Sequence, residues 1–370
     1  MATFYKPEVT FQPGSKTMER GYYTSPNVFA QEVARIFNRE WFCAGHTSRI
    51  RNPGNFFVVE AFGESILILR DHKNEVRAFY NICRHRGTHL CETQEGRFSK
   101  SIQCPYHAWT YALDGKLIGA TLMKELKDFN KEDYPLVPVE MQLWEGFIFL
   151  TLSRQPKPFS EAFSVLLDKF GRWNLPLLKP ARRIVYDVNA NWKFIFQNYN
   201  ECGHCPPVHP QLTKISPYDS GENDLIEGAF VGGFMLLEGA QSLTLSGNAC
   251  AMPVGELASE DHSRVYYYSI FPNMLLSLHP DYVMFHTIWP QSPERSVIWC
   301  EWLFHPEAFD QKDFHPEDGI DFWDMTNRQD WHMCELSQRG VASRAYQPGP
   351  YSPREALSAA FDRHYLNIIG

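Results

Sequence analysis

The sequence predicts an α+β protein, in which an all-β module precedes a domain made of an antiparallel sheet and surrounding helices. Three observations support this prediction. Short β-rich runs separated by turn residues occupy positions 41–152. Longer strand and helix segments follow the proline-containing stretch 154–158. The length of 370 residues is sufficient for two domains and a large core.

The N-terminal segment is expected to form an arm that leads into a helix on the second domain. A polar, proline-containing stretch covers the first 26 residues, and Ser25-Pro26-Asn27 then begins an amphipathic helix over 28–39. The expected boundaries are 1–40 for the arm and helix, 41–153 for the β module and 154–370 for the second domain.

Turn residues divide the β module into hairpins. Asp114-Gly115 and Glu145-Gly146 each separate two short strands, and Asp-Gly is a strong hairpin signal. The expected strands of the module are 55–60, 65–70, 76–81, 109–112, 116–118, 141–143 and 147–152.

In the second domain, the expected helices and strands follow one another in a less regular order. Residues 219–260 are rich in glycine and receive no assignment, and Gly340 is expected to end a long helix. Helices are expected over 160–170, 319–339 and 354–366, and strands over 182–189, 265–270, 283–289 and 296–304.

Composition argues against several classes of protein. The net charge is −8 and no block of Lys or Arg occurs, so we expect no nucleic-acid partner. No run of 18 apolar residues is present, and the N-terminus has no apolar signal-peptide core, so we expect no membrane span and no export. Nine irregularly spaced cysteines favour a reducing cytoplasm over a secreted disulfide scaffold.

The β module contains a first cluster of metal-binding residues. Cys83-Arg84-His85 and Cys104-Pro105-Tyr106-His107 each lie in a loop between expected strands, with eighteen residues between the two halves. Two thiolates and two imidazoles match the ligands of a Rieske-type [2Fe–2S] cluster. A structural zinc site accepts the same ligand set. Zinc fingers usually group two Cys and then two His, and the mixed halves here favour iron–sulfur. His89 and Cys91 are interpreted as packing or outer residues.

A second cluster lies in the segment 191–210. Its apolar residues predict a helix, and Pro206-Pro207 should end that helix near His204 or Cys205. Glu201 and His204, three positions apart, would then share one helical face. Cys202 and Cys205 are interpreted as small core residues.

Two histidines in this segment could belong to a mononuclear metal site. After the turn, His209 can fold back toward His204. Two His and one carboxylate form the facial triad of oxygen-using ferrous iron. The segment alone is equally compatible with ordinary buried or surface histidines.

Together, Cys-x-His, Cys-x-x-His and Glu-x-x-His-x-x-x-x-His resemble the α-subunit of Rieske-type non-haem iron oxygenases, the ring-hydroxylating oxygenase family. The resemblance extends from the helix before Trp41 to the C-terminal helix. It implies a Rieske domain and a helix-grip-like catalytic domain with a mononuclear Fe(II). The implied ligands of the [2Fe–2S] cluster are Cys83, His85, Cys104 and His107.

The resemblance also assigns the ligands of the mononuclear iron. His204 and His209 would bind it, together with an Asp on a late helix. The family pattern places this Asp five residues before a Glu, which selects Asp330 ahead of Glu335. The other candidates on that helix, Asp321 and Asp324, fit surface carboxylates better.

Glu201 stands where aromatic-ring dioxygenases usually carry Asp. Glu at this position resembles the monooxygenases and demethylases that act on choline, glycine betaine and carnitine. In the family this carboxylate would bridge His204 of one subunit to His107 of the next, which implies a cyclic homotrimer.

The resemblance implies a terminal oxygenase that uses O2 and a small organic substrate. Electrons would come from a separate NAD(P)H-dependent reductase, since the chain has no convincing flavin or nucleotide motif. A small amine or betaine is the first substrate class, an aromatic ring or acid is the second, and a non-catalytic electron carrier or zinc protein is a third interpretation. Five aromatic residues could form a cation–π cage, line a flat pocket or fill the core: Tyr266, Tyr268, Tyr282, Phe285 and Trp289.

Overall fold

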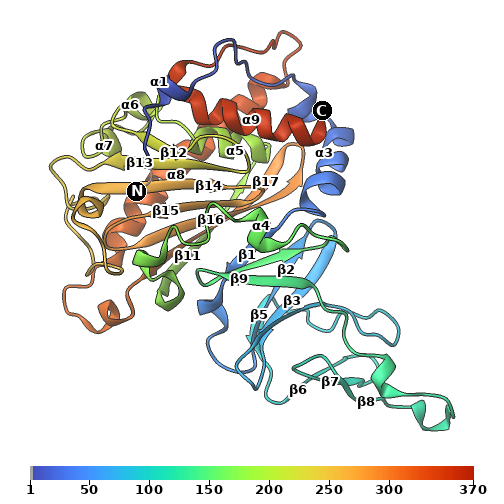
Figure 1. The fold of residues 1–370 in the computed structure, drawn as a ribbon. Coiled ribbons are helices and arrows are strands. Elements are labelled where there is room, and N and C mark those ends of the chain that lie inside the picture. Colours follow the sequence, from blue (N-terminus) through green and yellow to red (C-terminus); the bar gives the residue numbers. More distant parts are fainter. Residues whose placement is uncertain (1–2) are drawn as a thin grey trace. The chain divides into compact units, whose positions relative to one another are not determined.

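The structure, a computed structural model, describes residues 3–370, which form two compact units (Figure 1). The larger unit combines the N-terminal residues up to Phe37 with Val165–Gly370, and the smaller unit is Asn38–Ser164. The expected fold class is confirmed, with an all-β module and an α+β domain. Residues 154–164 belong to the smaller unit, whereas the sequence boundaries placed them in the second domain.

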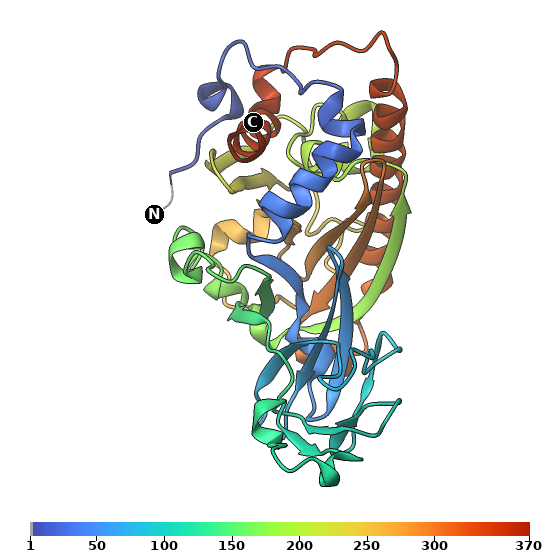
Figure 2. The same cartoon turned by 90° about the vertical axis from the view of Figure 1, so that its right-hand side faces the viewer.

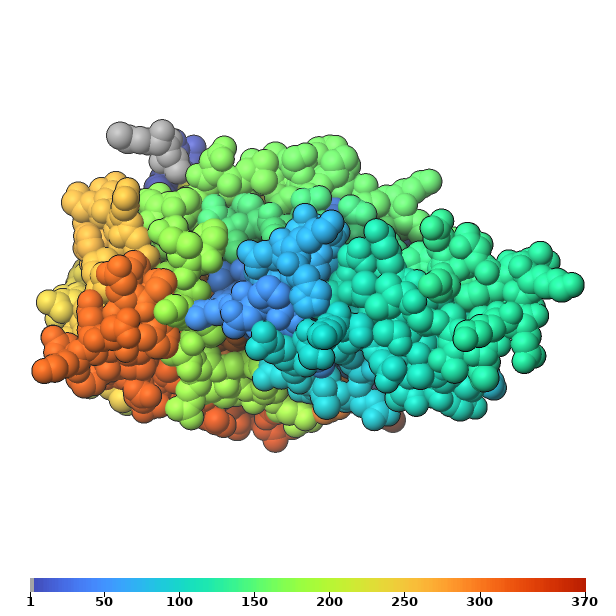
Figure 3. Space-filling model, turned by 90° about the horizontal axis from the view of Figure 1, so that it is seen from below, coloured from blue at the N-terminus to red at the C-terminus, as the bar shows by residue number. Residues whose placement is uncertain are grey.

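Three antiparallel sheets build the smaller unit. Glu145-Gly146, both at positive φ, join β9 to β10, in agreement with the hairpin expected there. Figure 3 shows one face of this unit in blue to green, where the segment near residues 120–130 projects from the surface. The strand order in the first sheet is β1 (Phe42–His46), β10 (Phe147–Thr151) and β9 (Glu140–Trp144). The order in the second sheet is β4 (Val76–Tyr80), β3 (Glu64–Arg70), β2 (Asn55–Ala61) and β5 (Glu95–Arg97). The order in the third sheet is β6 (Ser101–Gln103), β7 (Thr110–Ala112) and β8 (Leu117–Gly119).

One apolar cluster in the smaller unit holds the loops of the Cys/His motifs. Cys83 and Cys104 are each 2% exposed and pack in the same cluster as Leu67, Trp109 and Tyr111. The cysteines are therefore fixed by the core, and the loops that carry them have little freedom to move.

A seven-stranded antiparallel sheet forms the centre of the larger unit. Its edge near β12 depends on glycine, because a Cβ on Gly232 would lie 2.1 Å from the carbonyl oxygen of Tyr267, and one on Gly233 would lie 1.9 Å from that of Glu222. This requirement explains Gly232 and Gly233 within the segment that the sequence left unassigned. The spatial order is β11 (Lys179–Val188), β17 (Arg295–Phe304), β16 (Val283–Ser292), β15 (Met274–Leu278), β14 (Arg264–Ile270), β13 (Phe230–Leu236) and β12 (Glu222–Leu225).

Three helices pack against this sheet and against one another (Figures 1 and 2). They are α5 (Trp192–Tyr199), α8 (Pro316–Val341) and α9 (Ala356–Ile369). The N-terminal helix α3 (Pro26–Glu32) continues as a π-helical turn to Phe37 and joins them through Glu32, whose carboxylate is buried between α5 and α9. None of the helices described is both long and apolar enough to cross a bilayer.

Two expected helix boundaries are wrong. The helix predicted over 160–170 is only α4 (Phe159–Ala162), because turns then bury Leu166 and Phe170 with the spacing that suggested a helix. Gly340 does not end α8, which continues to Val341. Gly340 is exposed, and a Cβ there would contact nothing within 4 Å, so neither the packing nor the end of the helix requires glycine at this position.

Candidate functional site

The helix predicted to end near His204 or Cys205 is shorter than expected. Helix α5 ends at Tyr199, and His204 is the N-cap of a separate short helix, α6 (Cys205–Val208). Pro206 lies in the first turn of α6, where backbone N–H groups have no partner within the helix and proline is tolerated. The prolines therefore begin a helix, whereas the prediction had them ending one.

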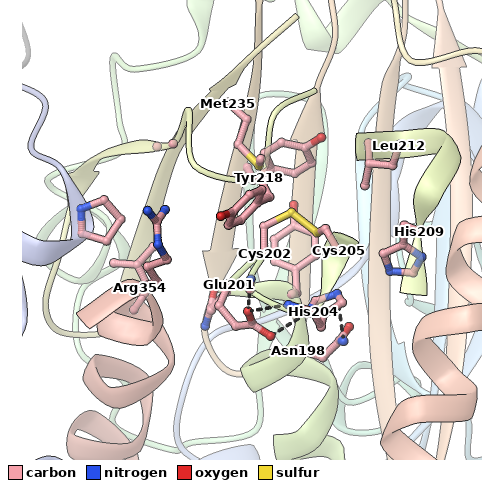
Figure 4. Close-up of a pocket in the computed structure, with 18 of the residues that line it drawn as sticks. Asn198, Glu201, Cys202, His204, Cys205, His209, Leu212, Tyr218, Met235 and Arg354 are labelled. Atoms are coloured by element: carbon pink, nitrogen blue, oxygen red, sulfur yellow. Dashed lines mark hydrogen bonds and ion pairs between the residues drawn. A yellow bond between two sulfur atoms is a disulfide. The ribbon is translucent and has the colours of Figure 1, made fainter. Parts of the chain in front are cut away.

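Glu201 and His204 meet in the loop between these helices, and not on one helical face as predicted. A carboxylate oxygen of Glu201 lies 2.5 Å from Nδ1 of His204 (Figure 4). The other oxygen accepts hydrogen bonds from the backbone N–H groups of Gly203 and His204. The loop thus fixes the carboxylate against the imidazole.

Three side chains converge beside this loop. Oδ1 of Asp330 lies 3.2 Å from Nε2 of His204 and 2.8 Å from Nε2 of His209. All three ligand atoms lie within 4.8 Å of one another. Asp324 is engaged elsewhere, because it accepts a hydrogen bond from the Tyr186 hydroxyl at 2.7 Å.

The far nitrogen of each imidazole also has a partner. His209 places Nδ1 2.7 Å from the side-chain oxygen of Gln329, and His204 places Nδ1 against Glu201. When Nδ1 carries the proton, Nε2 presents a lone pair to the centre, which is the usual arrangement of metal-binding histidines. Gln329 was not predicted, and its only signal in the sequence is its position next to Asp330.

Charge inside this group favours a cation. Burial lowers the pKa of His204, but hydrogen bonds and charges of Asp330 and Glu201 outweigh burial and raise it to about 10. Burial raises the pKa of Asp330, and hydrogen bonds from His204 and His209 reverse this effect and lower it to about 2. Two imidazoles and a carboxylate with an outer carboxylate therefore fit a divalent ion of the ferrous kind.

A pocket opens beside the three converging side chains (Figure 4). Its lining contains Glu201, His204, His209 and Asp330, together with polar groups from other elements. The larger apolar and aromatic lining residues are Tyr199, Leu212, Tyr218, Phe234, Met235, Tyr267, Trp323 and Leu357. The site thus combines a metal-binding group with an apolar, aromatic chamber.

The five aromatic residues considered for a cage fill the core instead. All are at most 3% exposed, and none is among the described residues that line the pocket. The hydroxyl of Tyr266 donates to Asp261 at 2.7 Å, and that of Tyr282 donates to the carbonyl oxygen of Leu243 at 2.6 Å. Tyr267, between two of the candidates, is the β14 residue that lines the pocket, because successive side chains of a strand point to opposite faces.

Cys202 and Cys205 form a disulfide, with their Cα atoms 5.0 Å apart. The interpretation of both as small core thiols is therefore wrong. The two cysteines are three positions apart in the sequence, one before and one after His204. Cys202 lies in the loop and Cys205 is the first residue of α6. The disulfide therefore closes a short loop that contains His204, the residue that contacts both Glu201 and Asp330.

The four residues of the first cluster also come together. The rings of His85 and His107 have centroids 4.7 Å apart, and buried Cys83 and Cys104 lie in the same two loops. Nδ1 of His85 is buried and has no hydrogen-bond partner among the residues described. A buried imidazole nitrogen without a partner, next to two buried thiols, fits a metal cluster.

Two aromatic side chains of the core contact the residues of the first cluster. The Tyr111 hydroxyl lies 3.3 Å from Sγ of Cys83, and Trp109 stacks on His85 with centroids 4.8 Å apart. Burial, together with the neighbouring Cys104 thiol, raises the pKa of Cys83. Cys91 packs in the apolar cluster of this unit, as its interpretation as a packing residue predicted.

Comparisons with known proteins agree with both groups. The family model of the Rieske [2Fe-2S] domain matches residues 40–130, and that of the ring hydroxylating alpha subunit (catalytic domain) matches residues 175–370. The glycine betaine monooxygenase oxygenase subunit of Chromohalobacter salexigens is 30% identical over 369 residues, which cover 92% of this chain and 82% of that protein. Its counterpart in Pseudomonas aeruginosa is 29% identical, with 91% and 85% covered.

A solved structure shares the whole architecture. The quaternary ammonium Rieske monooxygenase CntA in complex with its substrate L-carnitine matches with a TM-score of 0.79 and 25% identity, over 96% of this chain and 95% of that one. The chain therefore belongs to the ring-hydroxylating oxygenase α-subunit family, and it is a Rieske-type oxygenase whose cofactors are a [2Fe–2S] cluster and a mononuclear iron.

Proposed function

We propose that this oxygenase acts on a small quaternary ammonium compound of the betaine type. Two lines of support come from the similar proteins, whose names specify glycine betaine and carnitine, and from Glu201 in place of the Asp usual in aromatic-ring dioxygenases. A third is the aromatic lining of the pocket, because ring faces attract methylated ammonium groups.

The convergence of His204, His209 and Asp330 at the pocket wall carries this proposal. We assign these three residues as the ligands of the ferrous ion, because their ligand atoms lie within 4.8 Å of one another and face the pocket. The cluster ligands are then Cys83, His85, Cys104 and His107. When bound, the ferrous ion supplies the activation of O2 and the cluster supplies electrons.

The chain itself positions the substrate and controls water. Tyr267 and Trp323 line the pocket with largely buried rings, which exclude water and contact the methyl groups of an ammonium. Glu201 and Gln329 hold the two imidazoles at Nδ1 and keep Nε2 directed at the centre.

The proposed reaction places one oxygen atom of O2 on a carbon next to the quaternary nitrogen. The other atom leaves as water after uptake of two electrons and two protons. The C–N bond of the hydroxylated carbon then breaks with its electron pair on nitrogen, the hydroxyl proton is released, and the products are a carbonyl compound and a tertiary amine. Formaldehyde is the carbonyl product when the hydroxylated carbon is a methyl group.

Electrons are proposed to arrive from a separate NAD(P)H-dependent reductase and to pass between subunits of a homotrimer. His107 lies at the surface of the smaller unit and is half-buried, so another chain can reach its ring. Glu201 already contacts His204, and its side chain is 15% exposed. We propose that this carboxylate joins His204 to His107 of a neighbouring subunit.

Substrate-dependent electron use tests this function. The purified chain, combined with a Rieske-compatible reductase, is given methylated amines and aromatic acids, and NADH oxidation and formaldehyde are measured. We expect coupled NADH oxidation with at least one betaine. Coupled oxidation with aromatic acids alone would contradict the proposed substrate class.

The Glu201→Gln variant tests the proposed electron path in the same assay. It should retain all its iron but lose most turnover, since the carboxylate that links the two imidazoles is gone. Full turnover in this variant would contradict the role of Glu201.

A further inference from the structure

A single guanidinium reaches the pocket. Arg354 lies in the 3-10 turn Pro353–Glu355, directly before α9. Among the pocket-lining residues that the structure describes, it is the only Lys or Arg. In Figure 4, Arg354 and His209 lie at opposite sides of the pocket, with Glu201 and His204 between them.

The surroundings of Arg354 hold its side chain in place but leave its N–H groups available. The guanidinium carbon lies 5.2 Å from the ring centroid of Tyr218, a cation–π contact that orients the side chain. Its nearest described carboxylate is Glu8, at 3.8 Å, which is longer than a hydrogen bond. Both partners are more than 40% exposed, and such surface pairs contribute little.

The described pocket lining therefore contains one guanidinium and three carboxylates, those of Glu201, Asp219 and Asp330. The forked N–H groups of the guanidinium match the two oxygens of a carboxylate. Glu201 lies between Arg354 and His209, and the negative charges of Glu201 and Asp330 together would offset the two positive charges of a ferrous ion. A metal group whose charges offset one another does not repel a quaternary ammonium, and the rings of Tyr267 and Trp323 belong to the same pocket lining.

We propose that Arg354 binds the carboxylate of a zwitterionic substrate and so selects betaines over uncharged-tail amines such as choline. This inference rests on the proposed function and adds a specificity-determining residue to it. Contact with the carboxylate would orient the molecule, so that its ammonium methyl groups point toward His204, His209 and Asp330.

Substitution of Arg354 tests the proposal against a pair of substrates that differ only at the tail. Glycine betaine carries a carboxylate where choline carries a hydroxymethyl group. In the Arg354→Gln holoenzyme, kcat/KM for glycine betaine or carnitine should fall roughly 10- to 100-fold through KM, the loss typical of a charge-assisted hydrogen bond. Any turnover of choline should change little. Arg354→Lys should restore part of the loss because it keeps the charge.

Two further variants separate ligand binding from a structural role. Glu8→Gln breaks the contact of Arg354 with the one described carboxylate within 4 Å of it, and it should leave betaine use unchanged or improve it. Arg339→Gln, at an exposed position of α8 outside the pocket lining, controls for the loss of one positive charge. An equal loss in Glu8→Gln and Arg354→Gln would overturn the proposal, since the ion pair itself would then be what matters.

Direct binding distinguishes failure of this inference from failure of the proposed function. Isothermal titration of the oxidised holoenzyme with glycine betaine should show binding in the wild type and in Arg339→Gln, and weaker binding in Arg354→Gln. Equal losses for glycine betaine and choline in Arg354→Gln would refute the role of Arg354 and leave the proposed function intact. If the wild type neither binds nor oxidises any quaternary amine, the proposed function fails, and this inference fails with it.

Discussion

Replacement of Lys193 by Met should strongly destabilise the larger unit. The Lys193 ammonium lies 2.5 Å from the Glu32 carboxylate, and both side chains are at most 1% exposed. The same carboxylate accepts hydrogen bonds from the Tyr365 hydroxyl at 2.6 Å and from the Trp192 indole N–H at 3.0 Å. These contacts join α3, α5 and α9, and α5 leads directly into the loop of Glu201.

The structure sets the expected magnitude. Lys193→Met would leave the buried Glu32 charge with two neutral donors and no counter-ion. Removal of one partner from a buried ion pair costs about 3–5 kcal/mol. One kcal/mol lowers Tm by about 2–4 °C in a unit of this size, so the melting temperature should fall by about 6–20 °C. The Glu32→Gln/Lys193→Met double variant should lose less than the sum of the single losses, because it leaves no unpaired charge.

Differential scanning calorimetry of the purified holoenzyme measures this effect. Lys312→Met is the matched control, since Lys312 is exposed in the same unit and its replacement should leave Tm nearly unchanged. A Lys193→Met variant that melts within about 2 °C of the wild type would refute the reasoning, because loss of one partner from a buried ion pair should lower the free energy of unfolding by more than this shift allows. Fully additive losses in the double variant would refute the coupling of the two charges.

Three further predictions concern Gln329, Asp362 and Gly233. Gln329→Met should weaken iron retention against a chelator by about 10- to 100-fold, because His209 loses the partner of its Nδ1; His332→Ala, exposed on the same helix, should not. Burial raises the pKa of Asp362 to about 7, so the folded state holds this proton longer than the unfolded state. Wild-type Tm should therefore fall as pH rises from about 4 to 7, more steeply than in Asp362→Asn, and equal slopes would contradict the assignment. Gly233→Ala should lower Tm and open β12 to proteases, since its Cβ would meet a carbonyl oxygen at 1.9 Å, whereas Gly221→Ala, with 3.7 Å of clearance, should be tolerated.

Part of the site was predictable because two of its proposed ligands lie close together in the sequence. His204 and His209 lie five positions apart, and a turn between them was sufficient to bring them together. Asp330 came from the resemblance to a family, since nothing in the physics of its helix separates it from Asp324. The hairpins of the β module were predictable from their turns, because glycine at positive φ leaves few alternatives.

Other features depend on contacts between distant segments. Gln329 and Arg354 reach the site only once α8 and α9 have packed on the sheet, so their spacing in the sequence carried no signal. The sequence does not distinguish Tyr267 from its aromatic neighbours on β14, because only the pairing of the strand decides which side chains face the pocket. Pro206 is ambiguous in the sequence, because proline is common both after a helix and in the first turn of the next one, and here it lies in the first turn of α6.

Iron content and electron paramagnetic resonance, measured on the same samples, test the central claim that two separate iron centres occupy this chain. The wild type should hold about three iron atoms per chain, two in the cluster and one at the mononuclear site. His204→Ala should lose about one of them and keep the signal of the reduced cluster, while Cys83→Ser should lose that signal. A His204→Ala variant that retains every iron atom, or a wild type without a reducible paramagnetic cluster, would contradict the account.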